Sequence, residues 1–289
     1  MSVQTTLLSF VNRWECDEND HLNVQFYFSR FEEADRQFRL LSGLSETLVG
    51  ARRVRHVRFH AELRTGDLIT VHSSIAFDGP HMLTVIHELR DGASGELAAT
   101  ALDGYEPSAN SAKTLRQRFK AFQTSMIDEA APRGIPAGPA NARATIANLE
   151  AKGAQIAYRG TVLPRDVGVD GRADDRFALA CCTDGVAHVW QRTPMTHAYL
   201  TENGLGRVAV EMKLTWATPL KSGDTMIVLS GFTGVSAKTF AMRHHLFESR
   251  TSRLVATLDV IALTMDLERR LAVELPPEAH QAINKMLID

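Results

Sequence analysis

The amino-acid sequence predicts an α+β protein made of two copies of one unit, in which a long helix is wrapped by an antiparallel β-sheet. Three observations lead to this fold class. Apolar residues between Val24 and Leu41 recur at steps of three and four, as on the buried face of a helix. Residues 51–107 instead alternate with a period of two between short turns, which is typical of antiparallel strands. The same pattern of strands and turns returns later in the chain.

The first expected element is a strand, and the helix follows it. Residues 5–14 alternate roughly between apolar and polar side chains, which predicts a strand. The helix should begin after Asn23, whose side-chain oxygen can accept a hydrogen bond from the first turn. It should end at Ser42-Gly43, because glycine readily adopts the left-handed conformation that terminates helices. These limits allow about five turns.

Four antiparallel strands should come next. Residues 51–107 contain short turns at 64–67, 77–80 and 91–95, each between apolar runs. Turns of this length join neighbouring strands into hairpins. A long helix followed by such a sheet is the architecture called a hotdog.

The middle of the chain interrupts this pattern. Residues 132–139 are too rich in proline and glycine for regular structure, whereas residues 113–126 and 141–152 favour short helices. The segment therefore resembles a crossing linker between two units. We place an N-terminal unit at residues 1–125, a linker at residues 126–155 and a C-terminal unit at residues 156–289.

An internal repeat supports the second unit. At an offset of 157 residues, residues 63–67 lie over 220–224 and residues 96–100 lie over 253–257, without a gap between them. One register that keeps both the turn and the last strand indicates a duplicated domain. The second long helix should lie within residues 173–191, and residues 276–288 should form a short surface helix.

The composition limits the classes of function. Hydrophobic residues make up 44% and charged residues 23% of the chain, as in soluble globular proteins. A net charge of −2 gives no reason to expect nucleic acid or a membrane surface as a partner. No leader-like segment or run of about 20 apolar residues is present, so we expect a cytoplasmic protein. Three cysteines without metal-ligand spacing predict neither a disulfide framework nor a metal site.

Polar residues gather just before the predicted helix. A helix start offers unpaired N–H groups and the positive end of the helix dipole, which suit a developing negative charge. A carboxylate and a histidine beside it are the groups needed to hydrolyse an ester or thioester. Spacing alone leaves a simpler interpretation open, in which these residues only cap the helix and shape the turn. The cluster consists of Glu15, Asp17, Glu18, Asn19, Asp20, His21 and Asn23.

This segment resembles the signature of hotdog-fold acyl thioesterases of the 4-hydroxybenzoyl-CoA thioesterase type. The resemblance rests on Asp17, on His21-Leu22-Asn23-Val24, on Tyr27 and on Phe31-Glu32-Glu33-Ala34, and it covers residues 9–105. One departure is Asp20, which stands where that family usually has glycine. Together with the repeat, the resemblance implies a tandem double hotdog, similar to the fused form of acyl-ACP thioesterases.

The resemblance also implies roles for individual residues. Asp17 would act as general base on a water, with direct attack on the thioester as a variant. Backbone N–H groups at about 23–25 would hold the oxyanion, and no cofactor or metal is implied. The substrate would be an acyl thioester of CoA or of acyl carrier protein, and a homo-oligomer of fused chains stays open. The implied catalytic residues are Asp17, His21 and Asn23, and the implied substrate-binding residues are Val24, Gln25, Tyr27 and Phe28.

The second copy of the motif lacks a carboxylate at the key position. Aligning Asp20 with Asp170 puts Val167 under Asp17, whereas aligning it with Gly171 puts Gly168 there. We therefore expect one competent site, in the N-terminal unit, with Asp166 and Glu33 as the next candidate acids.

Two other functions remain open. One is a hotdog hydratase or dehydratase acting on acyl thioesters, whose expected Asp-x-Asn-Pro-x-His-like motif is incomplete here because the proline is missing. The other is a non-catalytic protein that binds acyl thioesters. Arginines 52, 53, 55 and 58 would lie on the rim and could meet CoA phosphates, although strand arginines are usually solvated.

Overall fold

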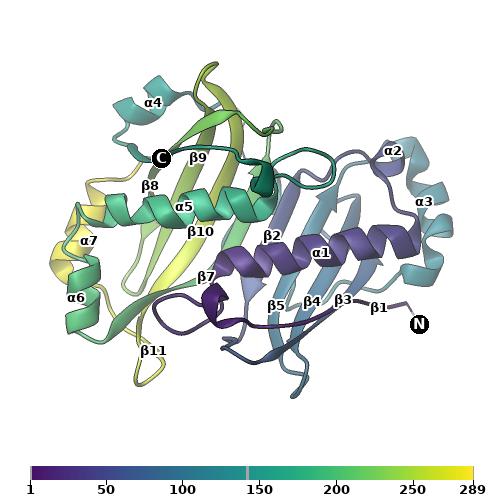
Figure 1. Ribbon diagram of the computed structural model, residues 1–289, viewed down its shortest axis with the longest axis horizontal. Coiled ribbons are helices and arrows are strands. Elements are labelled where there is room, and N and C mark those ends of the chain that lie inside the picture. Colours follow the sequence, from purple (N-terminus) through teal and green to yellow (C-terminus); the bar gives the residue numbers. More distant parts are fainter. Residues whose placement is uncertain (1, 141–142, 289) are drawn as a thin grey trace. The chain divides into compact units, whose positions relative to one another are not determined.

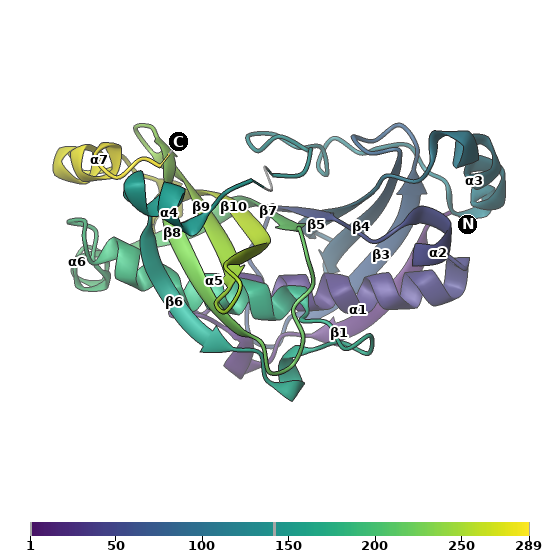
Figure 2. The same cartoon turned by 90° about the horizontal axis from the view of Figure 1, so that it is seen from above.

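The computed structural model describes residues 2–140 and 143–288. It divides into two compact units, Met1–Pro139 and Ala140–Asp289. Figure 1 shows that each unit has one long helix, α1 or α5, lying across its own sheet, and Figure 2 shows the strands of each unit curving around that helix. The predicted double hotdog is therefore confirmed as a fold.

The first unit carries the sheet order β1-β3-β4-β5-β2, with every neighbouring pair antiparallel. Its elements are β1 (Gln4–Phe10), η1 (Arg13–Glu15), α1 (Val24–Ser42), α2 (Glu46–Val49), β2 (Val54–Phe59), β3 (Leu68–Ala76), β4 (Leu83–Asp91), β5 (Leu97–Tyr105), η2 (Ala109–Ser111), α3 (Ala112–Arg118) and η3 (Lys120–Phe122).

The second unit repeats this plan with the order β7-β10-β9-β8-β6, and a short strand, β11, pairs with β10. Its elements are α4 (Ile146–Ala151), β6 (Gln155–Thr161), η4 (Pro164–Asp166), α5 (Asp175–Trp190), α6 (His197–Glu202), β7 (Leu205–Trp216), β8 (Thr225–Val235), β9 (Thr239–Glu248), β10 (Arg253–Asp266), β11 (Leu271–Ala272) and α7 (Pro277–Asn284).

Helix α1 forms where the sequence predicts it. Asn23 is its N-cap, and its side chain accepts a hydrogen bond from the Gln25 N–H at 3.1 Å. Gly43 ends the helix in the left-handed conformation, at φ 72°. The buried face carries the predicted apolar stripe, except that Leu41 at the final turn is exposed; the stripe's fully buried residues are Phe28, Phe31, Ala34 and Phe38.

The segment between the units differs from the prediction. The helix expected at residues 113–126 ends at Arg118, and η3 follows it. Met126, Ile127 and Ala130 then pack against a cluster of the first unit's sheet that contains Ile86. The predicted helix at 141–152 begins later, at Ile146, and residues 141 and 142 lie outside the described residues. Within the described ranges, no helix has the length and apolar character needed to span a bilayer.

Candidate active site

The turn before α1 is closed by its own backbone. The Asp17 N–H donates to the His21 carbonyl at 2.8 Å, and the Asp20 N–H donates to the Asp17 carbonyl at 3.1 Å. Asp20 adopts φ +58°, a left-handed conformation that favours glycine. This conformation explains why a glycine is usual at this place in the resembling family. The aspartate keeps the turn intact, so the departure leaves the geometry of the motif in place.

The turn fixes the carboxylate of Asp17. One of its oxygens, Oδ1, accepts hydrogen bonds from the backbone N–H groups of Asn19 at 2.9 Å and His21 at 3.3 Å. The side chain is half-buried. Burial raises the pKa of Asp17, and the two backbone hydrogen bonds oppose that rise. The result is a carboxyl group of fixed orientation with increased basicity.

His21 is buried in the same turn, and a second acid lies beside its ring. Its Nε2 lies 3.2 Å from Oε2 of Glu62, which is about one-third exposed. The Leu22 N–H, next in the chain, donates to the Leu63 carbonyl at 2.8 Å and so joins the motif to the segment that carries Glu62. Glu62 was not among the residues predicted from the sequence. The one available signal was its position just before Leu63, the first residue of the aligned repeat.

The start of α1 offers fewer free donors than expected. Of the three N–H groups at residues 23–25, that of Asn23 donates to the Glu15 carbonyl at 2.9 Å and that of Gln25 donates to the Asn23 side chain. Only the Val24 N–H of these three has no acceptor among the described residues. The expectation of three oxyanion donors is therefore corrected to one, because the cap and the turn already use the other two.

The remaining predicted site residues line the first turns of α1. Tyr27 is buried, and its ring packs edge-on against Phe59, with 5.2 Å between the centroids. Burial raises the pKa of Tyr27, with smaller contributions from the charges of Glu62 and Asp17. The phenol therefore stays protonated and can donate a hydrogen bond. Phe28 is completely buried and forms part of the core.

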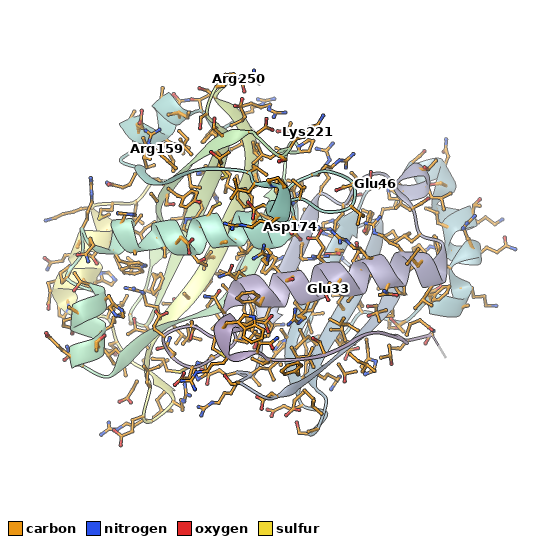
Figure 3. All side chains as sticks on the ribbon, viewed as in Figure 1. Glu33, Glu46, Arg159, Asp174, Lys221 and Arg250 are labelled. Carbon is orange, nitrogen blue, oxygen red and sulfur yellow. The ribbon has the colours of Figure 1, made fainter. Side chains whose placement is uncertain are left out.

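Other candidates lie away from this cluster or are already engaged. Glu33, labelled in Figure 3, has a side chain that is 49% exposed and 3.8 Å from Arg30. The Cys16 thiol contacts the Thr65 hydroxyl at 3.2 Å and the Asn12 carbonyl oxygen at 3.7 Å. The prediction that Arg55 lies on a rim is wrong, because Arg55 is completely buried and makes two hydrogen bonds to Asp103.

The second unit settles how the two motifs align. The Gly168 N–H donates to the Arg172 carbonyl, and the Ala173 N–H donates to the Leu220 carbonyl, as Asp17 and Leu22 do in the first unit. Gly171 takes the left-handed conformation of Asp20, at φ +73°. Gly168 therefore stands in the place of Asp17, and Arg172 in the place of His21. At the offset of 157 residues, Pro219 replaces Glu62.

The acids near the second motif have structural contacts. Asp166 matches Glu15, and each accepts a hydrogen bond from the backbone N–H three residues earlier, at 2.9 Å. Asp174, labelled in Figure 3, matches Asn23 and caps α5 by accepting from the Phe177 N–H at 2.8 Å. A shift of the loop is therefore needed before Asp166 could serve as a base.

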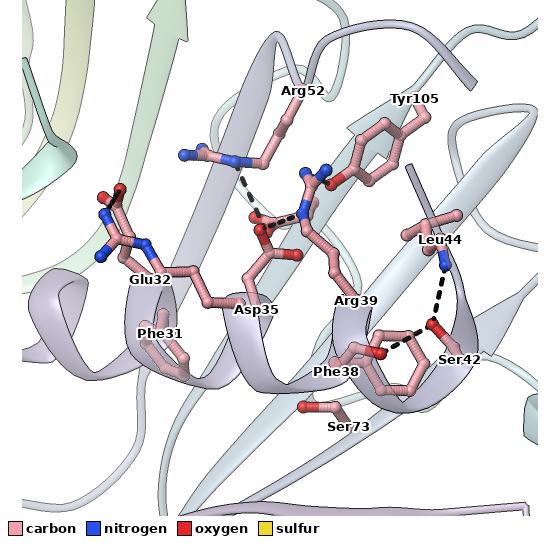
Figure 4. Close-up of polar contacts among 12 residues, drawn as sticks. Phe31, Glu32, Asp35, Phe38, Arg39, Ser42, Leu44, Arg52, Ser73 and Tyr105 are labelled. Carbon is pink, nitrogen blue, oxygen red and sulfur yellow. Dashed lines mark hydrogen bonds and ion pairs between the residues drawn. The ribbon is translucent and has the colours of Figure 1, made fainter. Parts of the chain in front are cut away.

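A second polar cluster is buried between α1 and the sheet (Figure 4). Asp103 accepts from Arg55 and lies 3.6 Å from Arg52, whereas Asp35 accepts from Arg39 at 2.7 Å. Asp35, His87 and Asp103 are close enough together to hold a metal ion. The neighbouring guanidinium groups already neutralise both carboxylates, so this arrangement favours internal ion pairs over a cation.

Comparisons with known proteins agree with the fold and the resemblance. Residues 162–283 match the model of the Thioesterase-like superfamily. A search of curated proteins finds no significant match. The matched residues lie in the C-terminal unit and make up less than half of the chain, whereas the predicted resemblance rests on the N-terminal motif; both point to thioesterase-like proteins.

Three solved structures share the double-hotdog fold over nearly the whole chain. A putative oleoyl thioesterase from Lactobacillus plantarum has a TM-score of 0.61 at 11% identity, covering 91% of this chain and 95% of that one. The 12:0-ACP thioesterase from Umbellularia californica has a TM-score of 0.57 at 14% identity, covering 90% and 94%. An acyl-ACP thioesterase from Bacteroides thetaiotaomicron has a TM-score of 0.56 at 11% identity, covering 90% and 98%. These likenesses concern the fold.

Proposed function

We propose that the protein hydrolyses an acyl thioester, carried by CoA or by acyl carrier protein, to a free acid and a thiol. One observation carries the proposal. The same backbone turn occurs twice, and at the position of Asp17 only the first copy bears a carboxylate, which is partly buried and lies beside a buried histidine with its own acidic partner. A turn needs none of these side chains for its structure, since the second copy folds with Gly168 and Arg172 in their places.

The proposed chemistry begins with Asp17 as general base. Its carboxylate accepts a proton from a water while the water oxygen attacks the thioester carbonyl carbon. The Val24 N–H, at the positive end of α1, stabilises the negative charge that develops on the carbonyl oxygen. The C–S bond then breaks, the thiol leaves with a proton, and the acid is released. Direct attack by Asp17 is the variant, and it would pass through an anhydride.

Neighbouring residues position these groups. Glu62 holds the ring of His21, which in turn orients the water or the thioester. Asn23 fixes the start of α1 by capping it. Val24, Gln25, Tyr27 and Phe28 are the proposed substrate-binding residues. The fold relatives named above include proteins described as acting on acyl-ACP and oleoyl substrates, which supports both thioester carriers as substrates to test.

The test is thiol release from a panel of short, long, branched and aromatic acyl-CoAs and an acyl carrier protein thioester. Asp17→Asn keeps the shape and both backbone hydrogen bonds while removing the base. We expect kcat/KM to fall by roughly 10²–10⁴. Glu96→Gln, an equal change of charge at an exposed position in the turn before β5, is the matched control and should keep wild-type activity.

The stability of the same variant separates loss of function from loss of folding. Because burial raises the pKa of Asp17, its charge costs stability at pH values above that pKa. Asp17→Asn should therefore unfold at the same or a higher temperature than the wild type at pH 7. If Asp17→Asn keeps full activity, Asp17 is not the base. A wild type that binds the panel without releasing thiol would favour the non-catalytic binding function.

A further inference from the structure

A buried ion pair joins the segment before the motif to helix α1. One terminal nitrogen of Arg30, on the second turn of α1, donates to both carboxylate oxygens of Glu15, at 2.7 and 2.9 Å. Both side chains are less than one-tenth exposed. The Glu15 carboxylate also accepts from the backbone N–H and the side-chain amide of Asn12, at 2.9 and 3.1 Å. Glu15 is therefore held from two sides inside the protein.

Glu15 is tied to α1 a second time through its main chain. Its carbonyl accepts from the N–H of Asn23, the N-cap of α1, at 2.9 Å. Two residues further on, the chain forms the turn in which the Asp17 N–H donates to the His21 carbonyl. The turn that carries Asp17 therefore follows a residue that is fixed to α1 at two points, the cap and the second turn.

These two attachments bear on the groups proposed to act on the thioester. The proposed base, Asp17, belongs to the turn, whereas the proposed oxyanion donor, the Val24 N–H, belongs to α1. The attacking water must meet the base while the carbonyl oxygen meets the donor, and a displacement of about 1 Å can slow such a reaction by 10²-fold. A link from the turn to the body of the helix keeps the two groups in place relative to each other.

The second unit keeps the main-chain attachment but has a cysteine where the buried cation stands. The matching acid, Asp166, accepts at its carbonyl from the N-cap of α5 at 3.1 Å. Counted from the two N-caps, the residue that matches Arg30 is Cys181, which is buried. The cations near the Asp166 carboxylate are Arg165 at 3.7 Å and Arg176 at 4.0 Å, whose side chains are 78% and 32% exposed.

This comparison separates the ion pair from the folding of the turn. The second turn and its helix start form with Cys181 in place of Arg30. Moving two charges from water into the interior costs free energy that their attraction often only just repays, so a buried pair is weak evidence for stability. The arginine stands in the unit whose turn carries Asp17, and the cysteine in the unit whose turn carries Gly168. What the pair adds is one fixed arrangement of the turn against the helix.

We propose, on the basis of the thioesterase function proposed above, that Arg30 acts through Glu15 to position Asp17 against the start of α1. Arg30 is thus a positioning residue. The test removes both charges at nearly constant volume, with Glu15→Gln and Arg30→Met together, because Arg30→Met alone would leave a buried carboxylate without its cation. Arg90→Met with Glu88→Gln is the matched control, since the contacts of that pair lie within β4 and the turn after it.

Steady-state thiol release separates positioning from substrate binding. In the double variant of Glu15 and Arg30, kcat should fall by roughly 10–100-fold, with KM within about twofold of the wild-type value and the melting temperature within about 3 °C. Arg30→Lys should keep most of the wild-type kcat, because a single nitrogen of Arg30 makes both contacts to Glu15. The control pair should have wild-type kcat and KM.

Amide hydrogen exchange measures the same effect without any substrate. The N–H groups of Asp17, Leu22 and Asn23 should exchange about tenfold faster or more in the double variant, because the turn opens more often. The matching N–H groups of the second turn, those of Gly168 and Ala173, make the same backbone bonds and should keep their rates. They serve as a control within the same molecule.

Unchanged exchange in the first turn would overturn the proposal, and so would a double variant with the wild-type kcat. A loss of activity that disappears on correction for the folded fraction would also overturn it, because the pair would then serve stability alone. Failure of the proposed function looks different. The wild type would then release no thiol from any ester of the panel, while the exchange rates would still decide whether the ion pair orders the turn.

Discussion

At the scale of single residues, the motif combines chemistry with local strain. Asp20 holds a left-handed conformation at φ +58°, which glycine adopts at less cost than any other residue. Its side chain is exposed. Gly171 takes the same place in the second unit at φ +73°. Exchanging the residues at these two positions therefore measures how much the aspartate lowers the free energy of unfolding.

We expect Asp20→Gly to stabilise the protein by about 0.5–1 kcal/mol, because relief of the left-handed strain exceeds the added flexibility of the unfolded chain. Thiol release should stay at the wild-type rate, since the Asp17 carboxylate keeps its backbone donors. Urea unfolding measures the stability. The reverse change, Gly171→Asp, should destabilise by a similar amount, and a loss of stability in Asp20→Gly would mean that the Asp20 side chain contributes to the turn.

Part of this site could be predicted from residues close in sequence, and part could not. The cap at Asn23 and the stop at Gly43 depend on neighbouring residues, so their types alone indicated them. The pairing of His21 with Glu62 joins two segments that meet only in the folded chain. The number of free N–H groups at the helix start was also overestimated, because the Glu15 carbonyl that accepts from Asn23 belongs to the preceding turn.

At the scale of elements, β2, β5 and α1 enclose a buried ion pair. Arg55 of β2 donates from Nε and one terminal nitrogen to the two oxygens of Asp103 on β5, at 2.8 and 2.6 Å. The arginines hold the pKa of Asp103 well below its usual range, despite burial that opposes this shift. The prediction placed Arg55 on the rim because a strand with alternating apolar and polar residues usually has one exposed face. Both faces of β2 are covered at residues 54–57.

The second unit shows how this pair can be replaced. Met212 and Val260 match Arg55 and Asp103 at the offset of 157 residues. Arg55→Met alone removes a positive charge that neutralises the buried Asp103 carboxylate. It should lower the free energy of unfolding by about 3–5 kcal/mol. Arg55→Met with Asp103→Val should recover more than half of that loss, because apolar residues of suitable shape can replace a buried pair. Denaturant unfolding of both variants measures this difference, and additive losses would contradict it.

At the scale of the whole molecule, the two units place a histidine in the same position with different neighbours. His87 and His244 each hydrogen-bond through Nδ1 to a serine at 2.7 Å, Ser73 or Ser230. Asp103 lies 3.4 Å from Nε2 of His87, whereas the matching residue in the second unit is Val260. Burial lowers the pKa of His244 to about 4; the charge of His245 adds to this shift, and that of Asp259 opposes it.

The lowered pKa of His244 predicts that the free energy of unfolding falls in acid. Between pH 6.5 and 4, unfolded His244 takes up a proton that the folded protein excludes, so stability is present above pH 6.5 and is lost as the pH falls toward 4. The loss from this group approaches about 3 kcal/mol. His244→Gln removes the titration and should flatten the fall in unfolding free energy between pH 7 and 4. The exposed His197→Gln is the control, and equal slopes for wild type and His244→Gln would refute the assignment.

The whole-chain organisation was the most predictable feature. The repeat was visible because the turn at Arg64–Asp67 and the turn at Lys221–Asp224 use the same bonds, such as the Arg64 and Lys221 N–H groups donating to aspartates three residues later. Such local requirements preserve residue types in both copies. The alignment of the two motifs stayed ambiguous in the sequence, because their side chains differ and only the backbone bonds match.

The second copy of the motif, with Gly168 and Gly171 in place of Asp17 and Asp20, bears on where in the chain functional residues lower the stability. A half-buried carboxylate and a non-glycine residue in a left-handed turn both lower stability, and at the positions of Asp17 and Asp20 both belong to the first unit. The second unit keeps the same backbone with glycine at both places. Duplication thus gives a protein one half that can tolerate reactive, strained side chains and another that need not carry them, so activity and foldability can be altered in separate halves of one chain.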